Sequence, residues 1–198
     1  MNRLQGAAEA IARVGAVVGG AMLLIAALTI CVDIVLRYTI AATVGGADEL
    51  AGYALAISSA WGFSAALLSR SHIRIDTLYV RVRSRARATL DLVSLAALAL
   101  FVALVAWHGW GVLRQSYVSG SRSLSELETP LVIPQALWFA GLVFFVAVAL
   151  LLLVRALAAY LKGDLQSVFQ LIGSKSAVAE AEEEIRATEQ AIESGPRA

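Results

Sequence analysis

The chain has 198 residues, of which 59% are hydrophobic and only 16% are charged, and its formal net charge is +1. Soluble globular domains are close to half apolar and a quarter charged, so this composition excludes an ordinary soluble domain and points to a lipid bilayer. We therefore expect membrane lipids among the partners of the chain, and no nucleic acid.

Four long runs without a charged residue follow one another along the chain. Each has about the 20 residues that a helix needs to cross a hydrocarbon core of about 30 Å, and backbone groups in lipid must be paired internally. The sequence therefore predicts an all-α membrane protein with four transmembrane helices and interfacial amphipathic segments. The runs are Val14–Val32, Leu50–Ser69, Leu92–Leu113 and Leu131–Val154, and the predicted spans cover about 14–37, 49–69, 90–113 and 132–155.

The first span is preceded by "LQGAAEAIARV", which we expect as an amphipathic lead-in at the interface, and it continues into "DIVLRY". Asp33, the only acid that we place beside a span interior, lies four residues before Arg37, so the two share a helix face. Acids inside membranes are candidates for function, which leaves an ion or proton site at Asp33 open. We favour an Asp33–Arg37 ion pair near the interface, because the partner lies one turn away.

The second span opens with "GGADEL". We expect Gly45 and Gly46 to break the first helix. Asp48 and Glu49 then fall at the start of the second helix, where carboxylates suit the positive end of the helix dipole.

The segment from Arg70 to Arg87 separates the second and third spans and carries six arginines against one acid. Short loops rich in arginine stay on the cytoplasmic side, which predicts that both termini are cytoplasmic. Loops 38–49 and 114–130 then face the opposite side. Apolar residues alternate with the arginines, so we expect an interfacial segment with its arginines among lipid headgroups.

His72, Arg74 and Asp76 form the most polar part of this segment, in "SRSHIRIDTL". One histidine with one acid makes no catalytic unit without a nucleophile or a metal. The only other histidine, His108, is predicted near the far side of the membrane, so the two cannot hold one metal ion or haem between them. We expect no catalytic, metal or cofactor site, no enzymatic activity, and a structural role for this cluster.

The fourth span opens with "VIPQALW", where Pro134 is expected in the first helical turn and Trp138 one turn later. The chain becomes polar after residue 162. We therefore predict a transmembrane domain over residues 1–162 and a cytoplasmic polar tail over residues 163–198, partly helical or disordered.

Four motifs in this order resemble the small membrane subunit (DctQ-like) of tripartite ATP-independent periplasmic (TRAP) transporters. They are "DIVLRY", "DELAGY", "HIRIDTL" and "VIPQALWFAGL", and the resemblance extends from about Val14 to Ala158. It implies a subunit of the bacterial inner membrane that scaffolds a large sodium-coupled permease subunit (DctM-like). The permease would take up, by symport, an organic acid delivered by a periplasmic substrate-binding protein. Structural or subunit-contact roles are then expected for Asp33, Arg37, Glu49, His72, Arg74, Asp76, Pro134 and Trp138.

Two other classes of protein remain alternatives. One is a small membrane redox or enzyme anchor, which would need a bound haem or quinone. The other is a homo-oligomeric channel or exporter, which would need a line of polar residues along one helix face. The sequence offers little beyond Ser58, Ser59 and Ser64 for such a line, and it shows no internal repeat.

Overall fold

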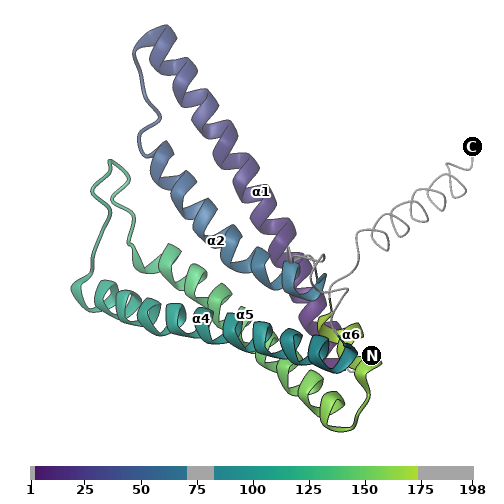
Figure 1. The fold of residues 1–198 in the computed structure, drawn as a ribbon. Helices are drawn as coiled ribbons and strands as arrows, with labels where there is room; N and C mark the ends of the chain where they lie inside the picture. Colours follow the sequence, from purple (N-terminus) through teal and green to yellow (C-terminus); the bar gives the residue numbers. More distant parts are fainter. Residues whose placement is uncertain (1–2, 71–82, 174–198) are drawn as a thin grey trace, which may run out of the picture.

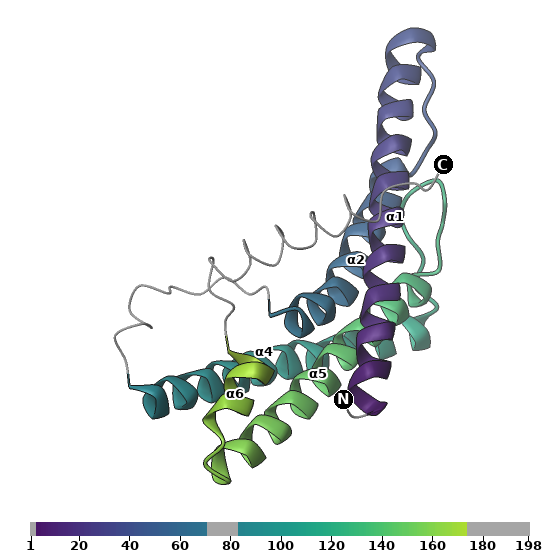
Figure 2. The same cartoon turned by 90° about the vertical axis from the view of Figure 1, so that its right-hand side faces the viewer.

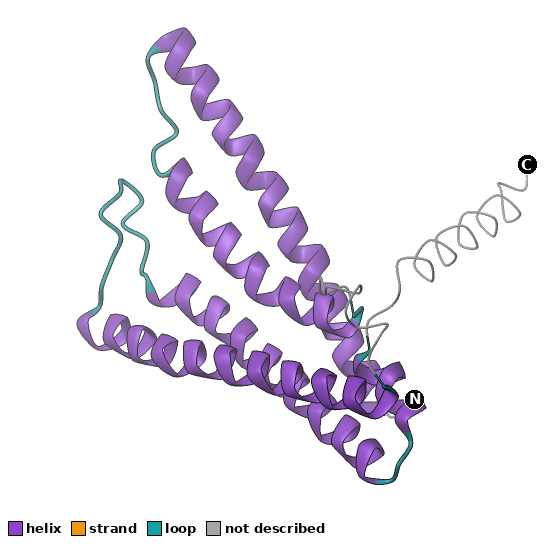
Figure 3. Ribbon diagram, viewed as in Figure 1, coloured by secondary structure: helices purple, strands orange, loops and turns teal. Residues whose placement is uncertain are grey.

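The computed structural model describes residues 3–70 and 83–173, and these residues fold into helices joined by loops (Figure 3). Four of the described helices are long and apolar enough to cross a membrane, which confirms the all-α fold with four spans. The orientation of the termini stays a prediction. The helices are α1 (Arg3–Ile40), α2 (Ala47–Leu68), α4 (Ser84–Ser119), α5 (Val132–Leu161) and α6 (Leu165–Ile172).

The four long helices form two antiparallel hairpins, α1–α2 and α4–α5. Figure 1 shows that the hairpins lie close together near α6 and diverge toward the loops that join α1 to α2 and α4 to α5. The turned view agrees, with α1 leading away from the α4–α5 pair (Figure 2). We call the end with these two loops the loop end, and the end near α6 the basic end.

The first helix is longer than the predicted span. It has 38 residues, which at 1.5 Å per residue is about 57 Å, against about 30 Å of hydrocarbon. The expected lead-in is therefore continuous with α1 and is not a separate segment. The expectation that the glycine pair breaks this helix is wrong, because α1 ends at Ile40 and Ala41 already has a positive φ of 54°. Gly45 and Gly46 instead lead into α2 with φ of 69° and 73°.

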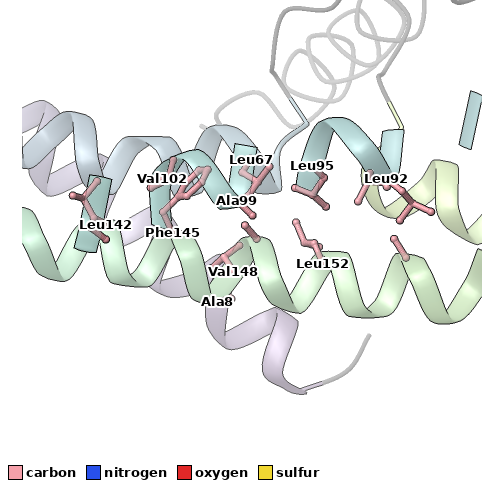
Figure 4. Close-up of a cluster of buried hydrophobic side chains, with 14 of the residues drawn as sticks. Ala8, Leu67, Leu92, Leu95, Ala99, Val102, Leu142, Phe145, Val148 and Leu152 are labelled. Atoms are coloured by element: carbon pink, nitrogen blue, oxygen red, sulfur yellow. The ribbon is translucent and has the colours of Figure 1, made fainter. Parts of the chain in front are cut away.

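The hydrophobic core lies around α5, which packs against α2, α4 and α6. Its buried face repeats every three or four residues, as expected for one side of a helix, and includes Ala149 and Ala156 at 0% exposure. These alanines let the neighbouring backbones approach closely, as is usual between helices in membranes. Figure 4 shows the meeting of the α4 and α5 faces, formed by Leu92, Leu95, Ala99, Val102, Leu142, Phe145, Val148 and Leu152.

Helices α1 and α2 cross at two glycines of α1. A Cβ atom built on Gly19 would lie 2.9 Å from both Cα and Cβ of Ser58, and one built on Gly15 would lie 2.9 Å from Cε3 of Trp61. The two glycines are four residues apart, so they share one face of α1. This Gly-x-x-x-Gly spacing is the arrangement that allows the closest approach of two helices in a membrane.

The short helix α6 packs against α4 and α5. Its N-cap residue Asp164 accepts hydrogen bonds from Ser167, from the backbone nitrogen at 3.0 Å and from the hydroxyl at 2.5 Å. These bonds hold the pKa of the Asp164 carboxyl below its ordinary value. Val168 and Ile172 are buried at 0% and 6% exposure. Packed residues thus continue beyond position 162, where we predicted the domain limit; that limit stays a prediction.

Replacing Gly19 with leucine should separate α1 from α2. The added side chain collides with the backbone of Ser58, and overpacking of this kind costs about 1–3 kcal/mol of stability. The matched control is Gly20→Leu, because a Cβ at Gly20 meets nothing within 4 Å. Thermal unfolding of both variants in detergent measures the difference. Equal unfolding temperatures for the two variants would contradict the glycine contact.

Candidate functional site at the loop end

Two carboxylates organise the loop end of the molecule. Asp33 belongs to α1 and Glu49 to α2, and both accept several hydrogen bonds from loop residues. We call the first group the Asp33 cluster (Asp33, Arg37, Thr43 and Val44). We call the second group the Glu49 cluster (Glu49, Tyr53, Ser123 and Ser125).

The Asp33 cluster closes the end of α1 onto the following loop. Arg37 Nε lies 2.7 Å from Asp33 Oδ2, so the expected ion pair is present. The other oxygen, Oδ1, accepts hydrogen bonds from the Thr43 hydroxyl and the Val44 backbone nitrogen, both at 2.7 Å. Asp33 is buried at 4% exposure, whereas the Arg37 side chain is 58% exposed. An ion pair with an exposed partner contributes little stability. The hydrogen bonds from the Val44 backbone and the Thr43 hydroxyl are therefore the main interactions that fix the Asp33 carboxylate.

The Glu49 cluster joins the two hairpins. Oε1 accepts a hydrogen bond from the Tyr53 hydroxyl at 2.5 Å, one turn along α2. Oε2 accepts from the hydroxyl of Ser123 at 2.5 Å and from that of Ser125. Both serines lie in the loop between α4 and α5, more than seventy residues away in the sequence. Hydrogen bonds to an ionised acceptor are about twice as strong as neutral ones, so Glu49 fixes this loop against the start of α2.

The two loops also fit together where the glycines of the first meet side chains of the second. A side chain at Gly45 would collide with Glu126, and one at Gly46 would collide with Leu127. Loop 120–131 is itself closed by hydrogen bonds from Ser123 N to Thr129 O at 2.9 Å and from Leu131 N to Ser121 O at 3.1 Å. Loops 41–46 and 120–131 therefore form one unit, which we call the loop platform.

In both clusters the carboxylate oxygens act as hydrogen-bond acceptors. Each carboxylate oxygen of Asp33 and Glu49 contacts a donor of the chain itself, which suits a structural role. Among residues 3–70 and 83–173, no three histidine, cysteine, aspartate or glutamate side chains come together as a metal site.

The remaining predicted residues lie apart from these clusters. Pro134 is buried in the first turn of α5, as expected. Trp138 is half-buried against α4, since a Cβ on Gly109 would lie 3.0 Å from Cζ3 of its ring. His72, Arg74 and Asp76 fall outside the described residues. A role of any of these residues in subunit contacts stays a prediction.

Three features of the structure were missed from the sequence. Asp91 is buried at 1% exposure in α4, so the expectation that Asp33 is the only acid beside a span interior is wrong. Asp91 lies inside the predicted span 90–113, and this position could have indicated its burial from the sequence. The serine donors to Glu49 lie in a loop that the sequence marks only as polar. Trp61, at the meeting point of α1, α2 and α5, carries no motif.

The fold and the clusters together define a multi-pass α-helical membrane protein. A family model described as "Tripartite ATP-independent periplasmic transporters, DctQ component" matches residues 26–159, which is more than half of the chain. The chain therefore belongs to the DctQ family of TRAP transporter components. No curated protein and no solved structure matches it.

Neutralising Glu49 should loosen the loop platform. In Glu49→Gln the hydroxyls of Ser123 and Ser125 lose an ionised acceptor, so we expect the docking of loop 120–131 to weaken by about 1–2 kcal/mol. Hydrogen exchange of this loop measures the change. Asp48→Asn is the matched control, because Asp48 is the exposed neighbouring acid in the same first turn. Equal exchange in both variants would show that Glu49 does not hold the loop.

Proposed function

We propose that this chain is the small permease subunit of a TRAP-type secondary transporter in a bacterial inner membrane. In this proposal it scaffolds a large sodium-coupled permease subunit. A periplasmic substrate-binding protein delivers an organic acid, which the permease carries into the cell. The observation that carries the proposal is the family match over residues 26–159.

The exposed surface of α1 supports a role as a scaffold. Only 11% of its most apolar window is buried within the chain, against 28–33% for the other three long helices. One stripe along α1 is exposed throughout and runs from Val17 (67% exposed) through Leu24, Leu28 and Cys31 to Val35 (59%). Its spacing of seven, four, three and four residues keeps these side chains on one face. We propose that this α1 stripe contacts the permease.

The loop platform is the surface that we propose for contact with the binding protein. With both termini cytoplasmic, the platform faces the periplasm. It presents the fully exposed Leu124 next to the exposed charges of Arg122 and Glu126. An apolar anchor surrounded by polar groups is typical of protein–protein contacts. Because Glu49 and the glycine pair fix its shape, a binding protein would meet a preformed surface.

We expect this chain alone to catalyse no uptake. Proteoliposomes containing this chain, its cognate permease and the cognate binding protein should accumulate the organic acid when a sodium gradient is applied. Omitting the permease or the gradient should abolish uptake. Transport by liposomes that contain only this chain would overturn the proposal and favour the homo-oligomeric channel.

The only cysteine of the chain gives a direct measure of the proposed contact. Cys31 is exposed on the α1 stripe, so a membrane-permeant maleimide should label it in the isolated chain and much more slowly in the complex with the permease.

The control for this experiment places the cysteine on another helix. In a Cys31→Ser background, Leu100→Cys lies on α4 at 62% exposure and should label equally in both states. Unchanged labelling of Cys31 in an assembled, active complex would show that the permease binds elsewhere.

A further inference from the structure

An apolar groove lies between α1, α2 and α5, on the half of α1 nearest the basic end. Its volume is about 550 Å³. The α1 wall runs from Ala10 to Met22, and Trp61 of α2 and Leu137 of α5 also line the groove. The lining holds no charged side chain. Gly15 and Gly19 bring α1 close to α2, and α5 contacts α2 at Trp61. The groove lies between these two contacts.

The length and volume of the groove suit a thin apolar occupant. From Ala10 to Met22 the wall is about 18 Å long. The groove offers about 550 Å³, within the range of about 300–1,000 Å³ that is typical of small-molecule sites. An extended acyl chain is a narrow apolar rod, and it can lie along a groove of this length and volume.

A cation lies beyond one end of the groove. Arg155 follows Leu137 by eighteen residues, which is five full turns, so the two share one face of α5. Its Nη1 donates to the side-chain oxygen of Gln5, which precedes Ala10 by about 7 Å along α1. Among the described residues no carboxylate pairs with Arg155. Arg155 is half-buried, and a guanidinium that donates to a neutral amide can also bind an anion, for which phosphate is a favoured partner.

We propose that this groove binds one phospholipid, with an acyl chain against Val14, Val18 and Trp61 and the phosphate at Arg155. The site is distinct from the α1 stripe and does not depend on the proposed transport function. It differs from the general lipid contact of a membrane protein because one chain contacts three helices along a groove and its headgroup meets a fixed cation.

Filling the groove tests the acyl-chain half of the site. The full chain is extracted from membranes, exchanged extensively into detergent, and its bound phospholipid is counted by native mass spectrometry. We expect one phospholipid for each wild-type chain and almost none for Val18→Trp or Val14→Trp. The control is Val32→Trp. Val32 has the same 53% exposure as Val18 and lies on the Val14 face five turns further along, outside the groove.

Changing Arg155 tests the headgroup half. Delipidated chain is titrated with vesicles of phosphatidylglycerol in phosphatidylcholine. Arg155→Ala should weaken binding by about fivefold, the usual effect of one cation near an anionic lipid, and Arg155→Lys should keep most of the affinity. Circular dichroism shows that each variant is folded.

Three results would overturn the proposal. The wild-type chain could retain no phospholipid, or Val32→Trp could remove lipid as fully as Val18→Trp does, which would indicate general surface lipid. A cysteine placed at Val18 could also cross-link to the permease in the assembled complex, in which case a protein segment occupies the groove. None of these results bears on whether the complex transports, so the two proposals fail separately.

Discussion

The packing of Trp61 against two glycines is the contact on which the arrangement of the helices depends. Its indole ring lies between Gly15 of α1 and Gly141 of α5, where an added Cβ would come within 2.9 Å of ring atoms in both cases. The indole Nε1 donates to Leu137 O at 3.1 Å, which satisfies the one polar group of the side chain inside an apolar region. Phe144 stacks on the same ring with centroids 5.6 Å apart. Three helices are thus positioned by one side chain.

The hairpins diverge toward the loop end, and the two ends of the molecule are held by different interactions. At the basic end, α6 covers the junction with Val168 and Ile172. There Arg70 donates to the Phe169 carbonyl at 3.5 Å, and the Arg87 guanidinium lies 5.2 Å from the centre of the Phe169 ring. At the loop end, Glu49 bridges the hairpins through charge-assisted hydrogen bonds. The divergence leaves α1 exposed along most of its length, which is the surface that a membrane partner can use.

Local features were predicted from the sequence and remote ones were not. The Asp33–Arg37 pair follows from a four-residue spacing on one helix, and Pro134 in the first turn follows from the missing amide hydrogen of proline. The partners of Glu49 lie 74 and 76 residues away. A polar loop of serines has many possible targets, and only the closure of two hairpins selects one of them.

The sequence by itself determined the class of protein, because four apolar runs without charges leave helices across a membrane as the stable solution. It also determined the family, through motifs whose order extends over most of the chain. The tertiary structure decided where the helices approach, which acids are buried, and that α6 belongs to the packed part of the chain. The physical reason is that helix packing depends on contacts between small residues of one helix and large side chains of another, as Gly15 and Gly141 contact Trp61. Such pairing is a property of the assembled helices: the four-residue spacing of Gly15 and Gly19 marks a face suited to close approach, but it does not specify that Trp61 and Ser58 are what they meet.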